Sequence, residues 1–142
     1  MIKKKKKKSK LQVRKDNPNS KYWQKKAMGE WGRIVHLQTG CAICMQNGED
    51  HGGKLEAHHL VTRNAPECKF DPDNGILLCT WHHKFSPEIS AHKAPAAFLL
   101  FLQEFYPREY EYMRQHIIYR PTMLKKSAKD WYEILEKLKG NE

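Results

Sequence analysis

Two short pairs of residues have the type and spacing of metal ligands. Cys41 and Cys44 are separated by two residues, and the same spacing separates Cys79 from His82. Thiolates and imidazoles are the ligands that tetrahedral zinc prefers, and two such pairs make a complete set of four. The spacing therefore predicts a structural zinc site built from Cys41, Cys44, Cys79 and His82. Cys68 stands outside this spacing and is interpreted as a free thiol, although it could replace His82 as the fourth ligand.

Four more polar residues lie between or beside these pairs. His58 and His59 are neighbours in a predicted strand over 54–61, where adjacent side chains point to opposite faces, so one imidazole could bind a metal while the other faces a different groove. Asn74 lies in an Asp-Asn-Gly turn, and His83 follows it by nine residues. Each feature alone is weak, because a histidine pair can simply end a strand and Asp-Asn-Gly is ordinary turn chemistry. Their joint order and spacing form the signal.

This order resembles the HNH endonuclease family, the zinc-containing branch of the ββα-metal (His-Me finger) nucleases, over residues 41 to about 86. The resemblance implies that His59 is the general base and that Asn74 organises the loop. It also implies that His58 and His83 bind a catalytic divalent cation. The family usually has Cys in place of His82, so it is open which of His82 and His83 binds which ion. The offset from Asn74 favours His83 for the catalytic metal.

These residue types suit the hydrolysis of a phosphodiester. An imidazole with an unperturbed pKa of about 6.5 can take a proton from water near neutral pH. A cation held by two imidazoles keeps coordination positions for phosphate and water, which would tolerate Mg²⁺, Mn²⁺ or Ni²⁺. Arg63 and Lys84 are candidates for phosphate contacts, although lone charges near loops are more often just solvated.

The positive charge of the chain is concentrated at its N-terminus. The net charge is +10, and residues 1–26 hold twelve basic residues and one acid, so the remaining residues are nearly neutral. A basic arm of this kind indicates a polyanionic partner, with nucleic acid ahead of an anionic membrane. The arm does not by itself distinguish DNA from RNA, because it reads charge. Its candidate nucleic-acid-binding residues are Lys3, Lys4, Lys5, Lys6, Lys7, Lys8 and Lys10.

The patterning predicts an α+β fold, and the resemblance implies that its centre is a ββα-metal core with a structural zinc site, flanked by N- and C-terminal helices. Six consecutive lysines and an Asn-Pro-Asn turn indicate an arm without regular structure over 1–19. The predicted division is an arm over 1–19, a helix within 20–40, a zinc-bound core over 41–90 and a helical region over 91–142. Residues 41–57 are interpreted as mostly loop. Strands are expected at 54–61 and at 76–78, an apolar run bounded by turn residues, and the two are expected to pair as a hairpin. Helices are expected at 80–86, 94–105 and 107–119, and a last amphipathic helix is expected to be capped by Ser127.

The leading hypothesis is a metal-dependent HNH endonuclease that cleaves DNA, encoded by a phage or mobile element. The alternative is a non-catalytic zinc module that binds nucleic acid, or an accessory protein of phage DNA packaging or recombination, with terminase or recombination proteins as partners. The longest apolar run has nine residues, against about 20 for a membrane span, so no membrane partner is expected. A cytoplasmic location is predicted, and the lysine run leaves a nuclear location as a minor alternative.

Overall fold

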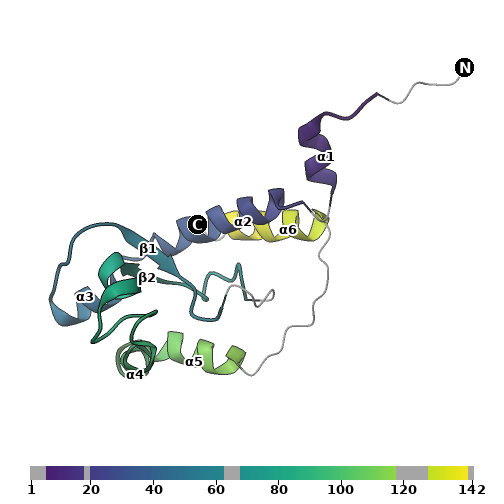
Figure 1. Ribbon diagram of the computed structural model, residues 1–142. Coiled ribbons are helices and arrows are strands. Elements are labelled where there is room, and N and C mark those ends of the chain that lie inside the picture. The colour runs from purple at the N-terminus through teal and green to yellow at the C-terminus, as the bar shows by residue number, and fades with distance from the viewer. Residues whose placement is uncertain (1–5, 18–19, 63–67, 118–127, 141–142) are drawn as a thin grey trace, which may run out of the picture. The chain divides into compact units, whose positions relative to one another are not determined.

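The computed structural model describes residues 6–17, 20–62, 68–117 and 128–140 (Figure 1). The chain divides into two compact units, one of residues 1–30 with 124–142 and the other of residues 31–123. Helix α2 (Tyr22–Val35) contributes to both. Within the described ranges, every helix is too short or too polar to cross a bilayer.

The first unit contains α1 (Lys10–Asp16), most of α2, and α6 (Ala128–Lys139). Leu135 and Leu138 of α6 are buried, as is Ala27 of α2. The rings of Trp23 and Tyr132 meet edge to face at 5.4 Å, so α2 and α6 pack against each other within this unit (Figure 1). The buried positions of α6 agree with the amphipathic helix that the sequence predicts, while Ser127, its predicted cap, lies outside the described residues.

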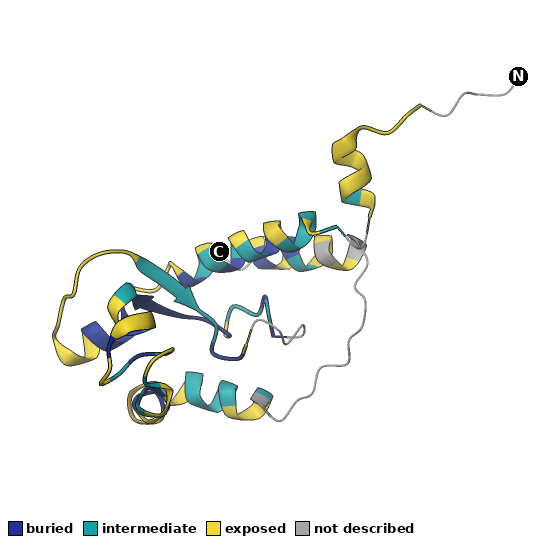
Figure 2. Ribbon diagram, viewed as in Figure 1, coloured by how far each residue is buried: buried dark blue, intermediate teal, exposed yellow. Residues whose placement is uncertain are grey.

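Helix α1 lies in the arm that was predicted to lack regular structure over 1–19. Its N-cap is Ser9, whose Oγ accepts a hydrogen bond from the Gln12 amide at 3.1 Å. One turn further on, Gln12 Nε2 donates to Asp16 Oδ1 at 2.8 Å. A capping serine and an i,i+4 side-chain bond favour a helix. The prediction is therefore wrong for α1, which buries none of its side chains (Figure 2).

The second unit is built around an antiparallel pair of strands, β1 (Leu55–His58) and β2 (Ile76–Cys79). Leu55 pairs with Cys79 and His58 with Ile76. All four residues of β2 are buried, and those of β1 are half-buried (Figure 2). The predicted hairpin is confirmed, but its first strand ends at His58, three residues earlier than expected.

Short helices surround this hairpin. Phe98 and Leu102, from the helix that follows Pro95, join Ile43 and Leu78 in one buried cluster. This helix and the next begin at Pro95 and Pro107, as the sequence predicts, because proline suits the first helical turn. The helix α3 (Ala42–Asn47) was not expected, because residues 41–57 were interpreted as mostly loop. The helices of this unit are α3 (Ala42–Asn47), η1 (Trp81–Phe85), α4 (Pro95–Phe105) and α5 (Pro107–Ile117).

The helical turn η1 follows β2 directly and completes a strand–strand–helix unit. The Ser86 amide donates to the Trp81 carbonyl at 2.9 Å, a span of five residues, so the turn is wider than an α-helical one. The mixed α+β class that the sequence predicts is confirmed, and α4 and α5 lie together on one side of the hairpin (Figure 1).

Candidate functional site

Three thiols and one imidazole converge between α3, the end of β2 and η1. Cys41 directly precedes α3, and Cys44 lies one turn into it, so both sulfurs face the same way. Cys79 ends β2, and His82 follows it on the first turn of η1. All four residues are buried, and their ligand atoms lie within 4.8 Å of one another. The predicted set Cys41, Cys44, Cys79 and His82 is therefore brought together.

The spacing of these four atoms fits a tetrahedral zinc ion. His82 Nδ1 lies 3.6, 3.4 and 3.5 Å from the sulfurs of Cys41, Cys44 and Cys79, and the sulfurs of Cys44 and Cys79 are 3.8 Å apart. With zinc bonds of about 2.3 Å to sulfur and about 2.05 Å to nitrogen, tetrahedral geometry sets about 3.6 Å between sulfur and nitrogen and about 3.8 Å between sulfurs. The cluster can thus hold zinc as a Cys₃His site.

Burial favours the neutral form of these thiols. Burial raises the pKa of Cys44 to about 12, with the neighbouring thiols of Cys41 and Cys79 adding to the shift. Burial likewise raises the pKa of Cys79. Buried thiolates are stable only beside a compensating positive charge, which a bound zinc ion provides.

Cys68, the alternative fourth ligand, lies elsewhere. It is buried against Val61, and its carbonyl accepts a hydrogen bond from Asn74 Nδ2 at 2.9 Å. The structure therefore brings His82, and not Cys68, to the three other cysteines.

A second cluster contains three imidazoles. His58 ends β1, His83 lies on η1, and His92 lies in the segment between η1 and α4. His83 Nε2 is 3.2 Å from His58 Nδ1 and 3.0 Å from His92 Nε2. Ligands bound at about 2.1 Å and at right angles to each other are about 3.0 Å apart, so the spacing suits three neighbouring positions of one metal ion.

Burial is the main cause of the low pKa of His58. Together with the neighbouring imidazoles it lowers the pKa of this residue to about 3. Burial also lowers the pKa of His92. Neutral imidazoles keep a lone pair for a metal ion, so these residues are in the form that metal binding requires.

His92 was missed by the sequence analysis. It lies nine residues after His83, and backbone bonds bring it back: Ala91 N donates to His82 O at 3.0 Å, and His92 N donates to His83 O at 3.1 Å. The side chain of Ser90 stabilises this return, because its Oγ donates to Ser86 O at 2.8 Å. Nothing in the local sequence around His92 signals this contact.

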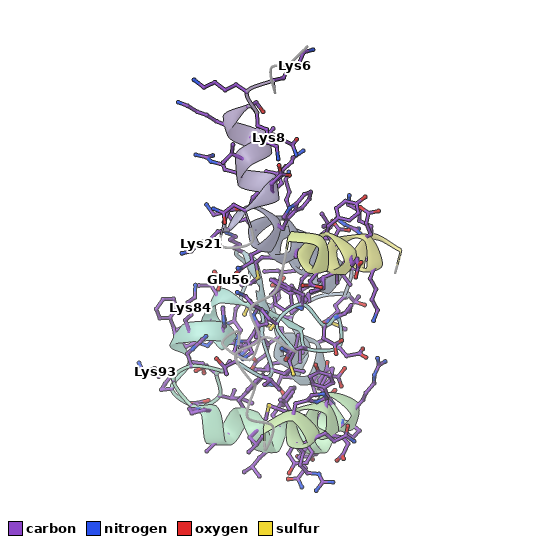
Figure 3. The ribbon with its side chains drawn as sticks, turned by 90° about the vertical axis from the view of Figure 1, so that its right-hand side faces the viewer. Lys6, Lys8, Lys21, Glu56, Lys84 and Lys93 are labelled. Carbon is purple, nitrogen blue, oxygen red and sulfur yellow. The ribbon has the colours of Figure 1, made fainter. Side chains whose placement is uncertain are left out.

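Glu56 orients the second cluster from β1. Its carboxylate lies 2.7 Å from His83 Nδ1 and 2.9 Å from Lys84 Nζ, and Figure 3 shows Glu56 and Lys84 side by side. The bond from Lys84, followed by that from His83, lowers the pKa of Glu56, which is thus ionised at neutral pH. A carboxylate that accepts the Nδ1 proton of His83 leaves the Nε2 lone pair directed at the cluster.

Glu56 could have been found from the sequence, and it changes the interpretation of Lys84. Residues two apart on a strand share a face, so Glu56 lies on the same face as His58. Lys84 was a candidate phosphate contact, and in the structure its ammonium is engaged by the Glu56 carboxylate.

His59 lies just beyond the end of β1. Its Nε2 is 2.9 Å from the carbonyl oxygen of Lys69, and its ring is stacked on the indole of Trp31. Opposite faces and different grooves were expected for His58 and His59. Instead both line one cavity of about 560 Å³, together with His83 and His92. The expectation fails because the strand ends at His58, so the alternation of side chains does not extend to His59.

Asn74 ties together the two ends of the connection between the strands. Its Oδ1 accepts a hydrogen bond from Val61 N at 2.6 Å, and its Nδ2 donates to Val61 O at 3.0 Å and to Cys68 O at 2.9 Å. The side chain is fully buried. Asn74 therefore holds Val61, two residues after His59, and Cys68, which directly precedes Lys69, whose carbonyl the imidazole contacts.

The remaining candidates lie on the surface or outside the described residues. Lys6, Lys7, Lys8 and Lys10 are exposed, and Figure 3 shows Lys6 and Lys8 with their side chains in solvent. Lys8 forms an exposed ion pair with Asp16 at 2.7 Å. Lys3, Lys4, Lys5 and Arg63 lie outside the described residues.

Comparison with known proteins gives one family match. Residues 41–85 match the model of a family described as HNH endonuclease. No curated protein and no solved structure matches the chain. The matched segment includes the four members of the thiol–imidazole cluster and His58, His59, Asn74 and His83, whereas Trp31 and His92 lie outside it.

Proposed function

We propose that this protein is a divalent-metal-dependent endonuclease that hydrolyses phosphodiester bonds in DNA, because residues 41–85 match the family model described as HNH endonuclease. The observation that carries the proposal is that His59 lines the same cavity as the imidazoles of His58, His83 and His92. It combines a candidate base with a candidate metal centre, which are the two groups that hydrolysis of a phosphodiester needs.

His59 is proposed as the general base. A ring nitrogen that faces a carbonyl oxygen carries a proton, so the contact with Lys69 O supports the neutral tautomer protonated at Nε2. That tautomer has its lone pair on Nδ1, which would take the proton from the attacking water. Asn74 supports this arrangement from the loop, since it binds the backbone of Val61 and Cys68.

His58, His83 and His92 are proposed as the protein ligands of the catalytic cation. A divalent cation bound there would neutralise charge on the scissile phosphate and on the leaving oxygen. Glu56 holds the Nδ1 proton of His83 and so directs its Nε2 to the cluster. Three nitrogen ligands suit borderline transition ions better than Mg²⁺, so we expect Ni²⁺ to bind more tightly than Mg²⁺.

Cys41, Cys44, Cys79 and His82 are proposed to bind a separate zinc ion with a structural role. This cluster is closed and supplies four protein ligands, which is typical of structural rather than catalytic zinc. Its position between α3, β2 and η1 would fix the turn that carries His83.

The exposed lysines of the arm support a polyanionic substrate, and the match of residues 41–85 to an HNH endonuclease family favours DNA. Counterion release from phosphates would drive this part of the binding, with little dependence on base sequence. Lys6, Lys7, Lys8 and Lys10 are exposed in the structure, and Lys3, Lys4, Lys5 and Arg63 remain candidates from the sequence.

The test of the proposed function is cleavage of supercoiled plasmid by the purified full chain. Nicking is expected with Ni²⁺, Mn²⁺ or Mg²⁺ and should stop on adding a chelator. His59→Ala should lower the rate by about 10²- to 10⁴-fold while zinc content stays normal. His116→Ala is the matched control, because His116 lies on α5 and contacts Tyr112.

Cleavage by wild type that survives unchanged in His59→Ala would reject the assigned base. DNA binding without cleavage under any of these metals would instead favour a non-catalytic zinc module. In a parallel binding experiment by calorimetry, His92→Ala should weaken Ni²⁺ binding, and His116→Ala should leave it unchanged. Equal affinity in wild type and His92→Ala would remove His92 from the ligand set.

A further inference from the structure

The proposed base is stacked on an aromatic side chain from outside the family segment. Trp31 lies on α2, ten residues before that segment begins. The centroids of its ring and of the His59 ring are 3.7 Å apart, and the two planes differ by 9°. Trp31 is 3% exposed, so the indole is a buried wall behind the imidazole.

The indole is itself held on two sides. Its Nε1 donates a hydrogen bond to the carbonyl oxygen of Asp71 at 3.0 Å. A Cβ atom at Gly75 would lie 3.0 Å from Cζ2 of Trp31 and 2.3 Å from Cγ2 of Val35. Only glycine at position 75 therefore lets this end of α2 approach the turn before β2. The position of Trp31 is set by the same loop that carries Asn74.

The stack and the hydrogen bond restrain the imidazole in different directions. The bond from His59 Nε2 to Lys69 O fixes where one nitrogen points, but the ring can still tilt about that direction. A parallel indole at van der Waals distance opposes this tilt. Both restraints depend on the segment 68–71, because Lys69 and Asp71 supply the two accepting carbonyls.

We propose that Trp31 is a positioning residue for the general base of the nuclease. The inference rests on the proposed function and extends it to a residue that neither contacts the cation cluster nor lies in the family segment. Small errors in the orientation of a base reduce the fraction of complexes that react, so they lower kcat more than they weaken substrate binding. The role of Trp31 is therefore a rate effect exerted through His59.

The experiment compares Trp31→Phe and Trp31→Leu in steady-state cleavage of a DNA duplex. Phenylalanine keeps a flat aromatic wall and should retain kcat within about threefold. Leucine removes the flat wall and should lower kcat by about 10- to 100-fold with KM nearly unchanged, since a misplaced catalytic group costs up to about 10² in rate. Val35→Ala is the matched control: it loses buried packing on the same helix and should lower thermal stability while keeping kcat.

A double-mutant cycle separates positioning from general damage. In the His59→Ala background, Trp31→Leu should cause no further loss of kcat, because there is no base left to position. The ring protons of His59 provide a second readout, since the indole ring current should shift them upfield in wild type and this shift should disappear in Trp31→Leu.

The outcomes are distinguishable. Full kcat in Trp31→Leu, or an equal loss with and without His59, would overturn the role of Trp31 while wild-type cleavage upholds the proposed function. A wild-type chain that cleaves with none of the metals would overturn the proposed function and the rate effect with it. The expected result is a kcat loss that needs His59 and is rescued by phenylalanine.

Discussion

The substitution Asn74→Ala tests how the loop that carries the candidate base is held. Asn74 is fully buried and forms three hydrogen bonds, two with the backbone of Val61 and one with the carbonyl of Cys68. Alanine removes all three and leaves the backbone groups buried without these partners. Val61 follows His59 by two residues, and Cys68 directly precedes Lys69. The backbone that carries the imidazole and the Lys69 carbonyl that it contacts should therefore both be held less firmly.

The expected cost follows from these three bonds. Removing one partner of a buried hydrogen bond costs about 1–3 kcal/mol, so the loss of all three should lower the free energy of unfolding by at least about 3 kcal/mol. Domains of this size are stable by about 5–15 kcal/mol, so the variant should still fold. Asn74→Asp keeps the acceptor for Val61 N but turns a carboxylate oxygen towards two carbonyls. It should therefore be at least as destabilising at neutral pH.

Urea unfolding at a fixed zinc concentration measures the stability, and plasmid nicking at saturating DNA measures the activity. Asn47→Ala is the matched control, since Asn47 is an exposed asparagine at the end of α3. It should change stability by less than about 0.5 kcal/mol. Asn74→Ala with wild-type stability would refute the bookkeeping of hydrogen bonds. If Asn74→Ala loses the expected stability but keeps full nicking activity, the link between Asn74 and His59 would be refuted.

Three further predictions address the zinc cluster, the arm and the response to pH. Cys79→Ser should lose the tightly bound zinc in metal analysis, whereas Cys68→Ser, which also replaces a buried thiol, should keep it. Deleting residues 1–8 removes six lysines. If three to four of them contact phosphates, the slope of log affinity against log salt concentration should become shallower by about three units, while cleavage at saturating DNA persists. An unchanged slope would assign the arm another role. Burial raises the pKa of Tyr112 above its usual value of about 10, and the Asp71 carboxylate, which accepts a hydrogen bond from the tyrosine hydroxyl, adds to the shift. The folded state therefore holds that proton more tightly, and stability should fall as pH rises above about 10. Tyr112→Phe should lack this part of the fall in urea unfolding between pH 8 and 11, and identical pH profiles would contradict the assignment.

Residue type and short spacing were enough to predict much of the site. The four candidate zinc ligands could be predicted because each pair spans a single turn: Cys41 and Cys44 at the start of α3, and Cys79 and His82 from the end of β2 into η1. The hairpin was predicted from an apolar run bounded by turn residues, and all of β2 is indeed buried. These are local properties, because residues three apart on a helical or tight turn lie close together.

Other members of the site became visible only in the tertiary structure. His92 reaches the imidazole cluster because two backbone bonds fold its segment back onto η1. Trp31 reaches His59 because Gly75 permits the close approach of α2. The choice of His82 over Cys68 likewise required the path of the loop, which turns Cys68 towards Val61. Each of these contacts joins segments that are distant along the chain. The distance between such segments in the folded protein depends on tertiary packing, which residue type and short spacing do not encode.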